Sequence, residues 1–102
     1  MIIYQVLCAV PPDIEQEWKE WMLAKHIPEV IDTGCFLKFT FNKVVKPETE
    51  GNARYVIQYS CASMDEFIRY GTEYAPELQK KYRDKYGESI SVERMVLERL
   101  VG

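Results

Sequence analysis

The chain has 102 residues, of which 47% are hydrophobic and 28% are charged, and its net charge is −3. We expect one domain over residues 1–102, and the dispersed basic residues argue against a nucleic-acid-binding protein. No apolar run approaches the roughly 20 residues of a transmembrane helix. The first ten residues have neither the basic start nor the cleavage site of a signal peptide, so we expect a cytoplasmic protein.

The first third of the chain predicts a strand followed by a helix. Residues 2–10 are apolar at both alternating sets of positions, which indicates a central strand covered on both sides. A helix should run from about residue 14 to residue 25, with Asp13 as its N-cap. Because Pro28 disfavours the helical conformation of the residue before it, we expect this helix to end near His26.

Three further strands follow. The segments 35–45 and 54–61 have strand-like patterns and are separated by a polar loop that contains Pro and Gly, as is typical of a hairpin. The last segment, residues 90–100, mixes apolar and charged side chains, as expected of an edge strand.

A second helix should precede the last strand. Ser63 and Glu66 form a capping box at its start. Gly71 lies on the apolar stripe of this helix, where we expect the backbone to approach the sheet closely. Pro76 should kink or split the helix near Tyr74.

This order, β-α-β-β-α-β, predicts a ferredoxin-like α+β sandwich with an antiparallel four-stranded sheet in the order 4-1-3-2. We expect the first and third strands to lie at the centre of the sheet and to run parallel. Both helices should cover one face. To that face we assign the alternating positions with the larger apolar side chains, namely Tyr4, Val6, Tyr55, Ile57 and Tyr59.

The opposite face of the sheet predicts a homodimer. It would present Ile3, Gln5, Leu7, Ala9, Val56 and Gln58. Such a face is too apolar for solvent and too polar for a monomer core, so we expect two copies to pair through it. Gln5 and Gln58 could hydrogen-bond on adjacent strands inside the interface. The alternative is a monomer with a partly apolar open face.

The three cysteines, Cys8, Cys35 and Cys61, have no CxxC spacing. An odd number in this arrangement argues against a disulfide framework and against a zinc site. Each lies in or beside an apolar run, so we expect small buried side chains. The alternative is a nucleophilic cysteine paired with His26.

Several short motifs stand out along the chain. W-x-x-W-M, H-I-P-E-V and T-G-C-F lie between Trp18 and Phe36, and MIIYQV, YVIQY and YAPELQ lie elsewhere. Together they resemble a small bacterial family of domains of unknown function in the dimeric α+β-barrel superfamily. The resemblance covers nearly the whole chain and implies the fold and the dimer, but no activity.

More distant relatives of that superfamily include EthD-like proteins, cofactor-independent quinone-forming monooxygenases, muconolactone isomerase and haem-degrading monooxygenases. EthD-like proteins also have an H-x-P at the end of their first helix, comparable to His26 and Pro28 here. This is an analogy at the level of the fold.

His26 is the only histidine and has three interpretations. It could cap the end of the first helix, line a ligand pocket, or act as a general acid or base. A helix cap would titrate above the ordinary pKa of about 6.5, and a ring buried among aromatic side chains would titrate below it. The candidate ligand-binding residues are Tyr4, Trp21, His26 and Tyr59, which could converge between the first helix and the sheet, where superfamily relatives have their cavity.

We expect no metal site, because no carboxylate or cysteine lies at metal-ligand spacing around His26. We also expect no cofactor; a haem-binding role would use His26 alone as the axial ligand. We expect Trp21 to be buried, so Trp21→Ala should be the costliest change in the first helix.

Two classes of function remain, since no nucleotide-binding or hydrolase motif is present. The first is a non-catalytic homodimer that binds a small apolar or aromatic molecule or serves as an interaction module. The alternative is a cofactor-independent monooxygenase or isomerase that acts on an aromatic or polyketide-like substrate with His26 as acid or base. We favour the first.

Overall fold

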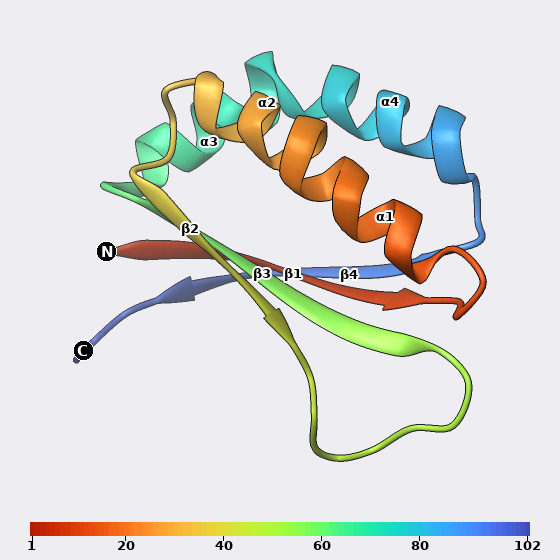
Figure 1. The fold of residues 1–102 in the computed structure, drawn as a ribbon. Helices are drawn as coiled ribbons and strands as arrows, with labels where there is room; N and C mark the ends of the chain where they lie inside the picture. The colour runs from red at the N-terminus through yellow and green to blue at the C-terminus, as the bar shows by residue number, and fades with distance from the viewer.

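The computed structural model describes residues 1–102 and contains one four-stranded sheet with all helices on one face (Figure 1). The strands are β1 (Ile2–Val10), β2 (Lys38–Lys43), β3 (Ala53–Cys61) and β4 (Ser91–Glu98), in the order β2-β3-β1-β4. The helical segments are α1 (Glu15–Trp21), the π-helical turn η1 (Met22–His26), α2 (Ile27–Asp32), α3 (Met64–Glu73) and α4 (Ala75–Tyr86). The ferredoxin-like α+β fold and its strand order are therefore confirmed. None of the helices combines the length and the hydrophobicity that crossing a lipid bilayer requires.

The two central strands run antiparallel, so the prediction that they run parallel is wrong. β3 is antiparallel to both β1 and β2. The helices after β1 return the chain so that β2 runs parallel to β1. The sheet leaves room for one strand between β1 and β2. The hairpin after β2 then reverses the chain into that position, and β3 must oppose both neighbours.

The two faces of the sheet divide as predicted. Tyr4, Tyr55, Ile57 and Tyr59 belong to the buried core between sheet and helices, and Val6 packs against it. The strand register places Gln5 opposite Gln58 on the other face. The Gln58 side-chain amide donates a hydrogen bond of 2.7 Å to the Gln5 side-chain oxygen, which confirms that the two side chains meet.

The first helix does not end near His26. Ile27 has helical angles (φ −61°, ψ −45°), and its N–H donates to the carbonyl of Met22, five positions back. α1, η1 and α2 therefore form one helix that continues through Pro28. A proline ring clashes with the carbonyl four residues earlier in a regular α-helix, and the wider π turn directly before Pro28 relieves this conflict.

Other predictions about helix ends have mixed outcomes. Asp13 is not an N-cap, because α1 begins after Ile14 without any side-chain cap. Ser63 does cap α3, since its hydroxyl accepts a hydrogen bond of 3.3 Å from the Glu66 N–H. The predicted break is also present: Tyr74 (φ −123°) separates α3 from α4.

Gly71 does not mark a close approach of α3 to the sheet. The residue is exposed, and a Cβ added there would meet no atom within 4 Å.

The predicted second strand, residues 35–45, is longer than the observed β2. Its first two predicted residues, Cys35 and Phe36, are buried but precede the strand, which begins at Lys38.

Trp18 is the central aromatic residue of the first helix. Its side chain is fully buried, and its indole Nε1–H donates a hydrogen bond of 2.9 Å to the Tyr82 hydroxyl on α4. Trp21 is only partly buried. The expectation that Trp21 carries most of the stability of this helix is therefore revised in favour of Trp18.

The three cysteines are free thiols and are all buried, as predicted.

Candidate functional site

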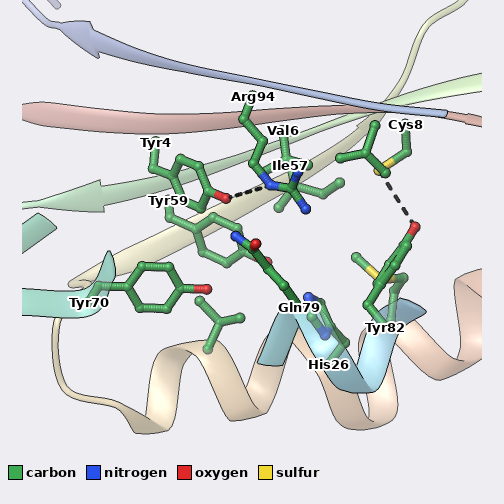
Figure 2. Close-up of a pocket in the computed structure, with 13 residues that line it drawn as sticks. Tyr4, Val6, Cys8, His26, Ile57, Tyr59, Tyr70, Gln79, Tyr82 and Arg94 are labelled. Carbon is green, nitrogen blue, oxygen red and sulfur yellow. Dashed lines mark hydrogen bonds between the residues drawn. The ribbon is translucent and has the colours of Figure 1, made fainter. Parts of the chain in front are cut away.

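A small cavity lies between the helices and the sheet (Figure 2). We call it the inner cavity. Its volume is about 30 Å³ and ten of its thirteen lining residues are hydrophobic. A space of this size holds only a water molecule or two. The side chains come from β1, β3 and β4 on the sheet side and from η1, α2, α3 and α4 on the helix side.

Three of the four candidate ligand-binding residues line the inner cavity. They are Tyr4, His26 and Tyr59. Trp21 is not part of the wall; its ring stacks on the His26 ring with centroids 5.1 Å apart and planes inclined by 23°. Trp21 therefore packs against the His26 ring without lining the cavity. Whether any of these residues binds a ligand stays a prediction.

His26 lies inside the helix rather than at its end, which excludes the interpretation as a C-terminal helix cap. Its ring is held between Trp21 and Tyr82, whose centroids lie 5.1 and 5.4 Å away. Burial lowers the pKa of His26 to about 4, although the Glu29 carboxylate acts in the opposite direction. The imidazole is therefore neutral at pH 7, with one nitrogen able to donate a hydrogen bond and the other able to accept one.

The tyrosines of the cavity wall are also neutral. Tyr4 stacks on Tyr59 with centroids 5.8 Å apart. Burial raises the pKa of Tyr4, Tyr59, Tyr70 and Tyr82. Each hydroxyl keeps its proton at neutral pH, so the wall combines aromatic faces with groups that can donate and accept hydrogen bonds.

Cys8 lines the same cavity as His26 but is not an activated nucleophile. The Tyr82 hydroxyl donates to the Cys8 sulfur at 3.9 Å, and burial raises the pKa of the thiol to about 11. A nucleophilic cysteine needs a substantial thiolate fraction. The structure therefore does not support the pairing of a reactive cysteine with His26.

Two larger hollows adjoin the inner cavity. The outer depression, about 260 Å³, lies against Phe67, Tyr70 and Val96; a second hollow, about 360 Å³, lies near the start of β4. Gln79 from α4 and Arg94 from β4 line all three spaces, and Figure 2 shows both side chains pointing into the cavity. The side chains of Gln79 and Arg94 therefore lie between the inner cavity and the two outer hollows.

Sequence reasoning missed Tyr70, Gln79, Tyr82 and Arg94 as cavity residues. Arg94 had a usable signal: it lies between Val92 and Val96 at the spacing of one strand face. The register pairs Arg94 with Val6 and Val96 with Tyr4, on the face that packs against the helices. An inward-facing cation on an edge strand is a known means of preventing edge-to-edge pairing, and its place beside a cavity makes Arg94 a candidate site residue as well.

No group of three or more His, Cys, Asp or Glu side chains is positioned to hold a metal ion. The space beside His26, about 30 Å³, is also far smaller than a porphyrin ring. The residues around His26 therefore do not fit a haem in this conformation.

Comparison with known proteins gives a family and a fold. The profile of a family described as "Domain of unknown function (DUF4286)" matches residues 1–100. No curated protein sequence matches the chain.

Three solved structures illustrate the fold similarity. An EthD family protein from Bacillus halodurans has 14% identity and a TM-score of 0.70, over 98% of this chain and 100% of that one. SnoaB, a cofactor-independent oxygenase from Streptomyces nogalater, has 13% identity and a TM-score of 0.68, over 99% and 95%. A dimeric ferredoxin-like protein from an uncultured marine organism has 12% identity and a TM-score of 0.60, over 99% and 96%. Identities this low establish the fold alone.

Proposed function

The chain belongs to the DUF4286 family of domains of unknown function, and we propose that it is a cytoplasmic homodimer that binds a small, mainly aromatic molecule beside His26. The inner cavity is the observation that carries the proposal. It joins aromatic walls to a few convergent polar groups, the composition typical of ligand sites. Three free, buried thiols fit a reducing compartment.

The inner cavity must open to admit an aromatic ring, because its volume is only about 30 Å³. The outer depression shares Tyr4, Tyr70, Gln79 and Arg94 with it. Side-chain rotamers at binding sites commonly change on binding while the backbone moves little. A movement of Gln79 and Arg94 would join the two spaces into one site that reaches from the surface to His26.

Gln79→Trp should weaken the binding of an aromatic probe such as 2-naphthol by about tenfold or more, since the indole would fill the entrance. Lys80→Trp is the matched control, because Lys80 is exposed and lines none of the three spaces. Binding is measured by NMR titration of the backbone amides. Shifts should centre on His26 and Tyr59 in the wild type. Absence of any shift, or equal weakening by both variants, would contradict this site.

The homodimer is supported by the helix-free face of the sheet. The hydrogen-bonded pair of Gln5 and Gln58 lies among apolar neighbours, with the side chains of Met95 and Leu97 at 46% and 36% exposure on the adjacent β4. Two such faces could bury their apolar groups while the glutamines stay paired. A similar fold occurs in a dimeric ferredoxin-like protein.

Leu7→Arg should convert the dimer to a monomer, because the substitution would bury an unpaired charge in the interface. Light scattering at micromolar concentration measures the outcome. Leu23→Arg is the control, since Leu23 is 51% exposed on the helical side of the molecule. A monomeric wild type would refute the dimer, and a dimeric Leu7→Arg variant would refute this choice of face.

The alternative function is a cofactor-independent monooxygenase or isomerase acting on an aromatic or polyketide-like substrate. One observation favours it: a neutral imidazole, the form that accepts a proton, lines the cavity. A pKa of about 4 makes that imidazole a weak base at neutral pH, however. Turnover of such a substrate that is lost in His26→Ala would establish the enzyme in place of the binding module.

A further inference from the structure

Arg94 lines both the inner cavity and the outer depression, and neither space has another charged side chain, since His26 is neutral at pH 7. It projects from β4 towards the helices, and its register partner is Val6. Figure 2 shows its guanidinium between Tyr4 and the centre of the cavity. The site therefore has one positive charge in an otherwise apolar and neutral polar lining.

The charge of Arg94 is not neutralised within the chain. None of the ion pairs includes it. Its Nε–H donates a hydrogen bond of 3.1 Å to the Tyr4 hydroxyl. A guanidinium has five N–H donors, so this bond orients the group and leaves its two terminal nitrogens available to an acceptor.

The positive potential of Arg94 extends through the cavity. Burial is the main cause of the pKa shift of four lining groups, and Arg94 lowers the pKa of all four: Tyr4, Cys8, His26 and Tyr70. A field of this sign stabilises negative charge wherever a ligand places it inside the site.

We propose that the ligand is an aromatic carboxylate whose carboxylate pairs with the terminal nitrogens of Arg94 while its ring lies against Tyr4 and Tyr70, which line both the outer depression and the inner cavity. This inference rests on the proposed function and adds the chemical class of the ligand. The planar guanidinium matches a carboxylate with two parallel hydrogen bonds. The outer depression supplies the apolar surface for the ring directly beside Arg94. The Tyr4 hydroxyl holds the guanidinium in position.

The test compares two probes of nearly the same shape, 2-naphthoate and the uncharged 2-naphthamide, by calorimetric titration of the full chain. The wild type should bind 2-naphthoate about tenfold more tightly, as expected for a hydrogen-bonded pair of charged groups. Arg94→Gln should remove this preference, so that the two probes bind the variant with similar affinity. Arg99→Gln is the matched control, because it deletes the same charge just beyond the end of β4 and outside the site.

The possible outcomes separate the two proposals. Equal affinity of the wild type for both probes would overturn the carboxylate specificity and leave aromatic binding standing. A preference that persists in Arg94→Gln would also overturn it, and would leave Arg94 with only the common role of an inward charge that protects an edge strand. Absence of binding by either probe would overturn both the proposed function and the ligand class built on it.

Discussion

Replacing Trp18 with alanine should lower the free energy of unfolding by about 3–5 kcal/mol, the usual cost of truncating a fully buried tryptophan. Trp18 is 0% exposed and packs against Phe41 and Tyr55, with ring centroids 5.7 and 5.0 Å away. It joins the first helix to both β2 and β3. The loss would be a large part of the stability of a domain of this size, and urea denaturation measures it.

Two further variants separate the causes of that loss. Trp18→Phe keeps most of the ring but removes the indole N–H that Tyr82 accepts, so it should cost much less than alanine. Trp21→Ala should also cost less, because Trp21 is only partly buried. An equal or greater loss in Trp21→Ala would show that the stacking of Trp21 on His26 and Tyr82 contributes more than burial indicates.

The difference in burial between Trp18 and Trp21 could not be predicted from the sequence. Trp18 and Trp21 are three residues apart, and both fall on the apolar stripe of the same helix. Their difference in burial depends on α4, which places Tyr82 within hydrogen-bonding distance of Trp18. That partner is 64 positions away, and no local pattern specifies the contact.

The strands were more predictable than the helices, because alternation with a period of two specifies both the faces of a sheet and the register between strands. The pairing of Gln5 with Gln58 could be anticipated in this way. The π turn before Pro28 could not. The rule that a proline disfavours a helical residue before it is statistical, and here an extra residue in one helical turn, together with the buried Ile27 and Val30, allows the helix to continue.

Part of the candidate site could be predicted from local sequence patterns, and the rest depends on contacts between distant elements. Tyr4 and Tyr59 follow from the alternation of two strands, and His26 follows from its being the only histidine. Gln79 and Arg94 come from α4 and β4, whose distance from each other depends on how the edge strand pairs with β1. The sequence marks Arg94 as inward-facing by its spacing from Val92 and Val96, but the three-dimensional fold was needed to bring Gln79 and Arg94 together at the cavity.

Lowering the pH from about 6.5 to 4 should destabilise the wild type more than a His26→Phe variant. The folded-state pKa of His26 is lowered by burial to about 4, against about 6.5 in the unfolded chain. The unfolded state therefore takes up the proton first. The contribution of neutral His26 is complete above pH 6.5 and is lost progressively as the pH falls towards 4. The whole contribution is about 3.5 kcal/mol, since the two pKa values differ by about 2.5 and each pKa unit corresponds to about 1.4 kcal/mol. About 2–3 kcal/mol of it should be lost between pH 6.5 and pH 4, where the folded state is half protonated.

Urea denaturation between pH 6.5 and pH 4 measures the free energy of unfolding of the wild type and of His26→Phe. The comparison of the two proteins removes the contribution of carboxylates that titrate below pH 5, because both proteins share it. His26→Phe keeps an aromatic ring between Trp21 and Tyr82, so cavity formation does not confuse the result. NMR titration of the single histidine gives the folded-state pKa directly. A value at or above 6.5, with parallel pH profiles for the two proteins, would place the imidazole in water. In that case the inner cavity would lose its central polar group, and with it the observation on which ligand binding beside His26 depends.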